Sequence, residues 1–251
     1  MPTGPGPIEA MPGGSATFLT TQWSMVLSAR DAASPGSREA LESLCAHYWL
    51  PIYAFLRRQH FTPADAEDLV QGFFASLLAH QSLEAVAPER GRFRSFLLAA
   101  LRNYLSDQRD RERALKRGAG IPPISLDADT AESQYASQVS DGETPERCFE
   151  RQWAWSVLRR AEEQLSRECR DAGKADLHAA LGPQTESGRN ESHAAIAARL
   201  GMTENAVRVA AFRLRQRFQE LVRREIRETV SHPSEVDAEI RHLLEVLANR
   251  S

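Results

Sequence analysis

The sequence predicts an all-α protein made of two small helical domains joined by a flexible linker, the second containing a helix-turn-helix. Two observations favour this fold class. Apolar residues recur at helical spacing in both halves of the chain, and no segment alternates apolar and polar residues as a strand would. Between the halves, residues 118–145 contain Gly, a Pro pair, Ser and five acids but no Lys or Arg, which is typical of a flexible acidic linker.

Bulk composition limits the possible function classes. With 251 residues and 42% apolar content, the chain can form one or two hydrophobic cores. The net charge is only −3, so any nucleic-acid signal must be local. Three scattered cysteines favour a reducing compartment, and no apolar run is long enough to span a membrane. We expect a cytoplasmic protein that makes no membrane contact and is a monomer when free. Residues 1–17, rich in Gly and Pro, are expected to be a disordered tail.

The first domain is expected over residues 18–117 and should consist of helices. Helical spacing of apolar residues predicts a helix between residues 37 and 59, which Pro51 should bend. A second helix should begin with Thr62 as its N-cap and Pro63 in its first turn. The predicted buried stripes of the second and third helices are Ala66, Leu69, Val70, Phe73, Phe74, Leu77 and Leu78, and then Phe93, Phe96, Leu97, Ala100, Leu101, Tyr104 and Leu105.

The second and third helices carry opposite charge. Residues 61–89 contain five acids and no Lys or Arg, whereas residues 90–117 contain nine bases and three acids. The first surface should repel nucleic acid and the second should attract it. This contrast indicates a protein that holds a protein partner and DNA at the same time.

The second domain is expected over residues 146–230. A helix should open at Thr144 and Pro145, and a short helix should follow around residues 175–181. The predicted inward positions of the first of these helices are Phe149, Trp153, Val157, Ala161 and Leu165.

Residues 192–227 have the pattern of a helix-turn-helix. Ala197 is small where two helices would cross, Gly201 supplies a turn residue with positive φ, and Val207 returns the second helix to the core. An ordinary helical hairpin would also fit, but seven Arg against two Glu between Val207 and Arg227 favour DNA binding. The first residues of such a helix contact base edges and later Arg residues contact phosphates. The candidate DNA-reading residues are Thr203, Glu204, Asn205, Arg208, Phe212, Arg213 and Arg215.

Taken together, these motifs resemble a bacterial RNA polymerase sigma factor of the extracytoplasmic-function type, over roughly residues 38–117 and 146–227. DAEDLVQGFF resembles the family's core-polymerase-binding helix. The matching positions are Asp65, Asp68, Leu69, Gln71 and Phe74. FRSFLLAALRNYLSDQRDR resembles the helix that melts and reads the minus-ten promoter element. The residues that this implies are Arg102, Asn103, Asp107, Arg109, Arg111 and Arg113. The helix-turn-helix resembles the domain that reads the minus-thirty-five element.

The chain departs from the family pattern in three places. Gly72 stands where many members carry an acid, and it begins a small-residue stripe with Ala75, Ser76 and Ala79 that a partner helix could approach closely. The connection over residues 170–191 is longer and more polar than in the family. Residues 231–251, expected to form a C-terminal amphipathic helix, lie outside the pattern. Their apolar stripe, Val236, Ile240, Leu243, Leu244 and Leu247, should dock, either to cap the second domain or to fold back on the first and restrain promoter access.

The resemblance implies a non-enzymatic protein with no cofactor, metal site or catalytic residue. No GxSxG, Walker-type loop or HExxH occurs in the sequence. The implied partners are RNA polymerase core and promoter DNA, and an anti-sigma factor is a further candidate. The alternative function is a helix-turn-helix regulator that does not bind core polymerase. A pure protein-binding adaptor is a third possibility, against which the basic third helix argues.

Overall fold

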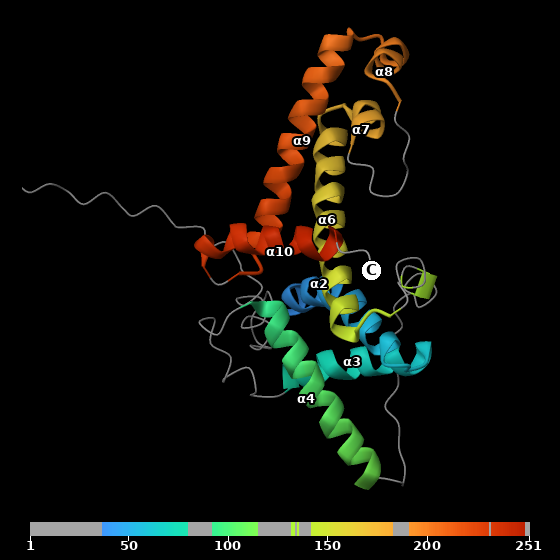
Figure 1. Cartoon of the computed structure of the whole chain (residues 1–251), viewed down its shortest axis with the longest axis vertical. Helices are drawn as coiled ribbons and strands as arrows, with labels where there is room; N and C mark the ends of the chain where they lie inside the picture. Colours follow the sequence, from blue (N-terminus) through green and yellow to red (C-terminus); the bar gives the residue numbers. More distant parts are fainter. Residues whose placement is uncertain are drawn as a thin grey trace, which may run out of the picture.

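The computed structural model describes residues 37–79, 92–114, 132, 133, 135, 142–182, 191–230 and 232–248. Every regular element in these ranges is helical, which confirms the all-α class (Figure 1). The elements are α2 (Ser37–Arg58), α3 (Pro63–Ala79), α4 (Phe93–Ala114), α6 (Pro145–Asp171), α7 (Ala175–Leu181), α8 (His193–Leu200), α9 (Glu204–Arg227), η3 (Pro233–Glu235) and α10 (Val236–Ala248). The predicted N-terminal tail and most of the predicted linker lie outside the described residues.

The helices begin and end at the signals that the sequence contains. The Thr62 hydroxyl accepts a hydrogen bond from the Asp65 backbone N–H at 3.2 Å, and Thr144 caps α6 in the same way. Gly201 ends α8 in the left-handed conformation, with φ of 63°, which glycine adopts without strain. Pro51 lies inside α2. Within the described residues, no helix is long and apolar enough to cross a membrane.

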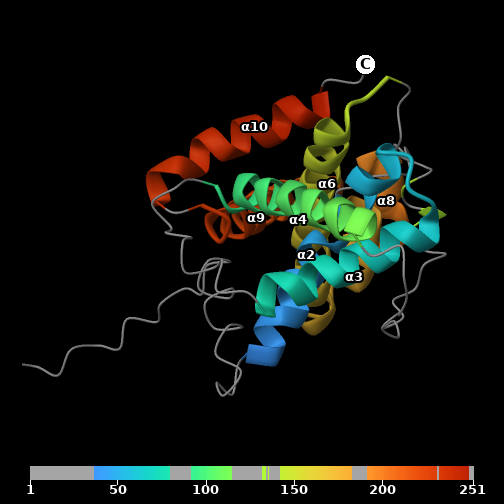
Figure 2. The same ribbon diagram turned by 90° about the horizontal axis from the view of Figure 1, so that it is seen from below.

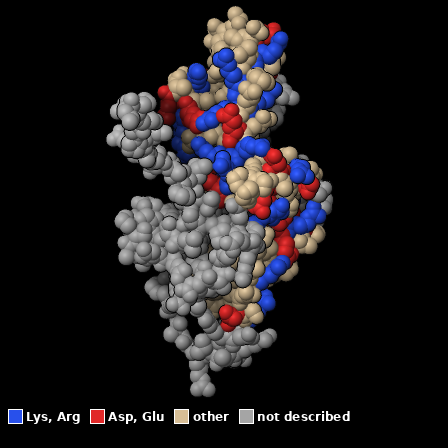
Figure 3. All heavy atoms as spheres, turned by 90° about the vertical axis from the view of Figure 1, so that its left-hand side faces the viewer, with Lys and Arg blue, Asp and Glu red and all other residues tan. Residues whose placement is uncertain are grey.

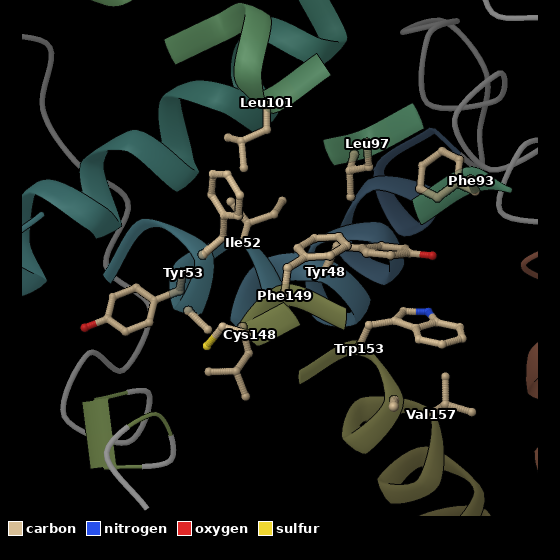
Figure 4. Close-up of a cluster of buried hydrophobic side chains, with 14 of the residues drawn as sticks. Tyr48, Ile52, Tyr53, Phe93, Leu97, Leu101, Cys148, Phe149, Trp153 and Val157 are labelled. Atoms are coloured by element: carbon tan, nitrogen blue, oxygen red, sulfur yellow. The ribbon is translucent and has the colours of Figure 1, made fainter. Parts of the chain in front are cut away.

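One large hydrophobic core joins segments of both predicted domains. Helix α2 packs against α3 and against the first half of α6. Side chains from α2, α4 and α6 converge there, and Phe149 and Trp153 of α6 are as fully buried as Tyr48 of α2 (Figure 4). The boundary predicted near residue 145 is therefore crossed by the core. Aromatic side chains bury large apolar areas, so this junction should be a main source of stability.

The other end of the molecule is a long helical hairpin that carries the α8–α9 pair. Helix α6 leads away from the main core and α9 returns along it (Figure 1). At the far end, Ile196, Ala197 and Val207 form a separate small core. Partly buried residues surround it: Ala180, Leu181, Leu200 and Met202.

Helix α10 lies across the base of this hairpin, close to the start of α4 (Figures 1 and 2). Its apolar stripe docks as predicted at Val236 and Leu243, which are buried, and the partly buried Ile240 and Leu247 pack on the same core. The prediction is wrong for Leu244, whose side chain is 58% exposed. At about 100° per residue, Leu244 lies at the edge of the stripe, about 80° from Val236.

Candidate functional site

Helix α3 turns its acidic side outward and its aromatic side inward. Asp65 and Asp68 are exposed, while Leu69 and Gln71 lie half-buried at the edges of the exposed face. Phe74 is buried, with its ring centroid 5.6 Å from that of Phe73. The structure therefore brings four of the five candidate polymerase-binding residues to the outer side of α3. Phe74 instead supports the helix from within.

Gly72 is required by a contact inside the molecule. A Cβ atom at Gly72 would lie 2.3 Å from the Tyr104 hydroxyl oxygen of α4, which is closer than any real contact. That hydroxyl accepts a hydrogen bond from Gln108 at 2.7 Å, and the Tyr104 ring meets Phe73 edge-on at 5.7 Å. The close helix approach predicted for the small-residue stripe is thus made at Gly72 by α4 itself. It fixes the acidic helix beside the basic one (Figure 2).

The candidate minus-ten residues occupy two separate edges of α4. At about 100° per residue, Arg102 and Arg109 fall within about 20° of each other, whereas Asn103 and Asp107 lie about 100–160° further round. All four side chains are exposed. The side chains of Arg111 and Arg113 lie outside the described part of the chain. A strand of DNA following one edge would meet either the two arginines or Asn103 and Asp107.

The arginine edge of α4 faces neighbouring helices. Arg102 donates to the Glu146 carboxylate at 2.6 Å, and this hydrogen bond holds the pKa of Glu146 below its ordinary value. Arg109 reaches the Gln59 side-chain oxygen at 3.5 Å. Both arginines remain largely open to solvent, and such exposed pairs contribute about 0–1 kcal/mol, so a nucleic-acid phosphate could replace either partner.

Two bases counted in the basic stretch, buried Arg94 and partly exposed Arg92, pair with a buried acid. Arg94 and Glu239 are almost fully buried and pair at 2.7 Å, and Arg92 reaches the same carboxylate at 2.8 Å. Arg94 also pairs with Glu150 at 2.7 Å and lies over the Trp153 ring at 4.9 Å. This ionic network connects α4, α6 and α10. The DNA-facing charge of α4 is therefore smaller than its count of bases suggests.

Part of the predicted linker is bound to α2. The Glu132 carboxylate accepts hydrogen bonds from Arg57 at 2.6 and 2.9 Å and from the Tyr53 hydroxyl at 2.5 Å. The Arg57 guanidinium holds the pKa of Glu132 below its ordinary value. Tyr135 is buried, edge-on to Tyr53 at 6.3 Å. Sequence reasoning missed this anchor, although Tyr135 is the one aromatic residue between positions 118 and 145.

The exposed face of α9 holds most of the other candidate DNA-reading residues. Glu204 and Arg208 form an exposed ion pair at 2.8 Å. Arg213 and Arg215 are exposed and make no ion pair among the described residues. Thr203 has a capping role, because its hydroxyl accepts from the Ala206 N–H at 3.2 Å. Figure 3 shows Lys and Arg side chains along this side of the hairpin, with Asp and Glu side chains between them.

Other arginines of α9 stabilise the hairpin. Arg217 pairs with Glu168 of α6 at 2.8 Å and lowers the pKa of that carboxyl to about 2. Arg223 pairs with Asp237 at the start of α10, and Arg160 of α6 pairs with Glu225 at 2.8 Å. Arg217 and Arg223, toward the main core, are thus held in ion pairs with α6 and α10, whereas Arg213 and Arg215, nearer the turn, are not ion-paired among the described residues.

The segment that contains α3 and α4 matches a known family. Residues 44–114 match the profile of sigma-70 region 2. This segment includes residues 44–58 of α2 and the whole of α3 and α4, and so both the candidate polymerase-binding and minus-ten residues. The match supports a sigma factor that acts in transcription initiation with RNA polymerase core and promoter DNA, a role that is not enzymatic. No curated protein and no solved structure matched the chain.

Proposed function

We propose that the chain is a sigma factor of the extracytoplasmic-function type, which directs RNA polymerase core to specific promoters and assists their melting. The observation that carries the proposal is the order of surfaces along one chain. An acidic α3 and a basic α4 lie within the region 2 segment, and a capped helix pair with exposed arginines follows on the α6–α9 hairpin. An anti-sigma factor remains a candidate partner.

In this proposal, α3 docks on the polymerase. Asp65 and Asp68 are exposed on a helix whose described residues contain no base, and Tyr104 at Gly72 fixes the orientation of that helix. Such a surface suits a basic helical element of the polymerase. Leu69 and Gln71 would complete the contact at its edges.

On promoter DNA, α4 and α9 would contact different elements. Asn103 and Asp107 would contact the strand being separated, while Arg102 and Arg109 would contact phosphates, together with Arg111 and Arg113. Helix α9 would place its first turns in the major groove of the minus-thirty-five element, with Asn205 and Arg208 at base edges. Arg213 and Arg215 would hold the backbone.

The deciding experiment is transcription in vitro from fragments of the source genome with purified core polymerase, with and without the full chain. A sigma factor gives new transcripts whose start sites share two upstream elements. Asp68→Arg should weaken core binding, whereas Glu163→Arg, the same charge change on an exposed position of α6, should not. DNA binding at a two-fold symmetric site without core polymerase, and without initiation, would establish the regulator alternative.

A second measurement isolates melting. Asn103→Ala should reduce permanganate reactivity of the minus-ten region while leaving closed-complex binding nearly unchanged. Ser106→Ala, at another exposed position of α4, serves as the matched control. Equal reactivity of the Asn103→Ala protein and the wild type would remove Asn103 from this role.

A further inference from the structure

The exposed face of α9 contains an apolar patch. Phe212 is 57% exposed and Val209 is 41% exposed, and the described residues hold just one other large hydrophobic side chain this open, Leu244 of α10. The opposite side of the helix is well packed, with Val207 at 0% and Ala211 at 3% exposure. The openness of Phe212 and Val209 is therefore a property of one face and does not reflect loose packing of the helix.

The patch lies in the middle of the candidate DNA-reading face. At about 100° per residue, Phe212, Asn205, Gln216 and Val209 fall within an arc of about 60°. Phe212 and Val209 are three residues apart, so their side chains are neighbours on the helix surface. An amide and an apolar pair thus share the centre of the face.

The charges around the patch indicate what covers it. Between positions 204 and 216 the exposed face carries Arg208, Arg213 and Arg215 against one acid, Glu204. Glu204 pairs with Arg208, so Arg213 and Arg215 leave the face with a net positive charge. A partner with apolar groups surrounded by negative charge complements this surface. The major groove of DNA is such a partner, because phosphates border it and each thymine presents a C5 methyl group within it.

We propose that Phe212 and Val209 are specificity-determining residues that contact thymine C5 methyl groups in the upstream promoter element. The inference rests on the proposed function, in which α9 enters the major groove. It deepens that function by naming the base that is read and the chemical group that is recognised. Asn205 beside the patch can pair with adenine N6 and N7, so the face as a whole suits neighbouring A·T pairs.

Replacing thymine with uracil tests this contact, because uracil lacks the methyl group and keeps every hydrogen-bonding atom. Holoenzyme reconstituted from the full chain and polymerase core first selects duplexes from a randomised library. Each thymine of the selected upstream element is then replaced by deoxyuridine in turn. At one thymine or more, affinity should fall about fourfold, which corresponds to about 0.8 kcal/mol for one buried methyl-sized group.

Side-chain variants test whether Phe212 and Val209 make the contact with the thymine methyl group. Phe212→Ala should lower affinity for the thymine duplex about as much as uracil does, and it should bind the thymine and uracil duplexes equally, as a double-mutant cycle requires. Val209→Ala should do the same at an adjacent thymine. Leu244→Ala removes an equally exposed apolar side chain outside the face and should change neither affinity.

The outcomes separate this inference from the proposed function. If duplexes are selected and transcribed but no uracil replacement changes affinity, thymine reading is wrong and the sigma-factor function stands. If Phe212→Ala lowers the affinity for the thymine duplex and for the uracil duplex by the same factor, the variant still distinguishes the two bases. The Phe212 side chain then does not read the methyl group. Loss of core binding in Phe212→Ala with unchanged DNA affinity would assign the patch to a protein partner. If no duplex is selected, the DNA-reading role of α9 fails together with the inference.

Discussion

The two ends of the molecule are held together in different ways. Around α2, large aromatic side chains from several helices are fully buried and an ionic network joins α4, α6 and α10. At the α8–α9 end, the described residues form a small core with three buried members, none of them aromatic. Regions with few buried apolar contacts open at lower free energy than the main core. We therefore expect a rigid block around α2, α4 and the first half of α6, here called the platform, and a more easily deformed end made of α7, α8 and the first turns of α9. In the proposed function this second end would contact DNA, so we call it the reading head.

The largest expected effect is at the centre of the platform. Trp153→Ala should lower the free energy of unfolding by about 3–5 kcal/mol, because it removes a buried aromatic side chain from the core that α6 shares with α2 and α4. It also removes the ring beneath Arg94. Chemical denaturation followed by circular dichroism measures the change. Trp155→Ala, at a partly buried neighbouring position on α6, should have a smaller effect. Equal effects would mean that the shared core contributes little.

The sequence predicts the parts of this platform that depend on local signals. Thr62, Thr144 and Gly201 mark helix ends by capping and by left-handed backbone geometry, which act over a few residues. The inward stripe of α6, including Trp153, was also correctly predicted. Its partner was not, because a stripe shows that a helix buries one face and does not show what covers that face.

The ionic network was missed for a related reason. Arg94 lies about 20° from Leu101 around α4, on the buried side, and Glu239 lies near the apolar stripe of α10. In the sequence, each of these residues is a single charge on an otherwise apolar helix face. The two charges are opposite and form an ion pair although they lie 145 residues apart in the chain. A count of charges cannot separate such buried residues from DNA-facing ones. The candidate minus-ten residues therefore share one segment but fall on two edges of α4, and their contact with DNA stays a prediction.

The second-largest loss of stability is expected where α10 contacts the platform. Glu239→Gln removes the charge that balances buried Arg94 and should lower the free energy of unfolding by about 2–3 kcal/mol. Glu245→Gln, on the exposed side of α10, should change it by less than about 0.5 kcal/mol. Thermal denaturation compares the two.

Deletion of residues 233–251 extends the same test to function. Lower stability with unchanged transcription per folded molecule would support capping. Higher transcription at unchanged stability would support restraint of promoter access. If neither quantity changes, both interpretations of α10 are wrong.

A smaller and more local effect is expected in the reading head. Ile196→Ala should cost about 2 kcal/mol, because the small core can partly collapse around the lost side chain. Hydrogen exchange should show the loss of protection confined to α7, α8 and the first turns of α9. Ala195→Gly, at an exposed position of α8, controls for helix propensity alone. Loss of protection in α2 and α6 as well would show that the two ends unfold as one unit.

The smallest expected effect lies where the hairpin meets the platform, at Glu228. Burial, assisted by the nearby negative charge of Glu225, raises the pKa of Glu228 to about 7 from 4.5. A raised carboxyl pKa favours the protonated folded state, so its stabilising contribution is complete below about pH 4.5 and is lost as the pH rises through 7. After allowance for partial solvent screening, the loss should be about 1–2 kcal/mol. Glu162, whose pKa burial also raises, acts in the same direction, so the variant must be compared with wild type. Glu228→Gln should flatten the pH dependence of unfolding between pH 5 and 8, whereas Glu163→Gln should not. Identical slopes for wild type and Glu228→Gln would show that Glu228 does not titrate in this window.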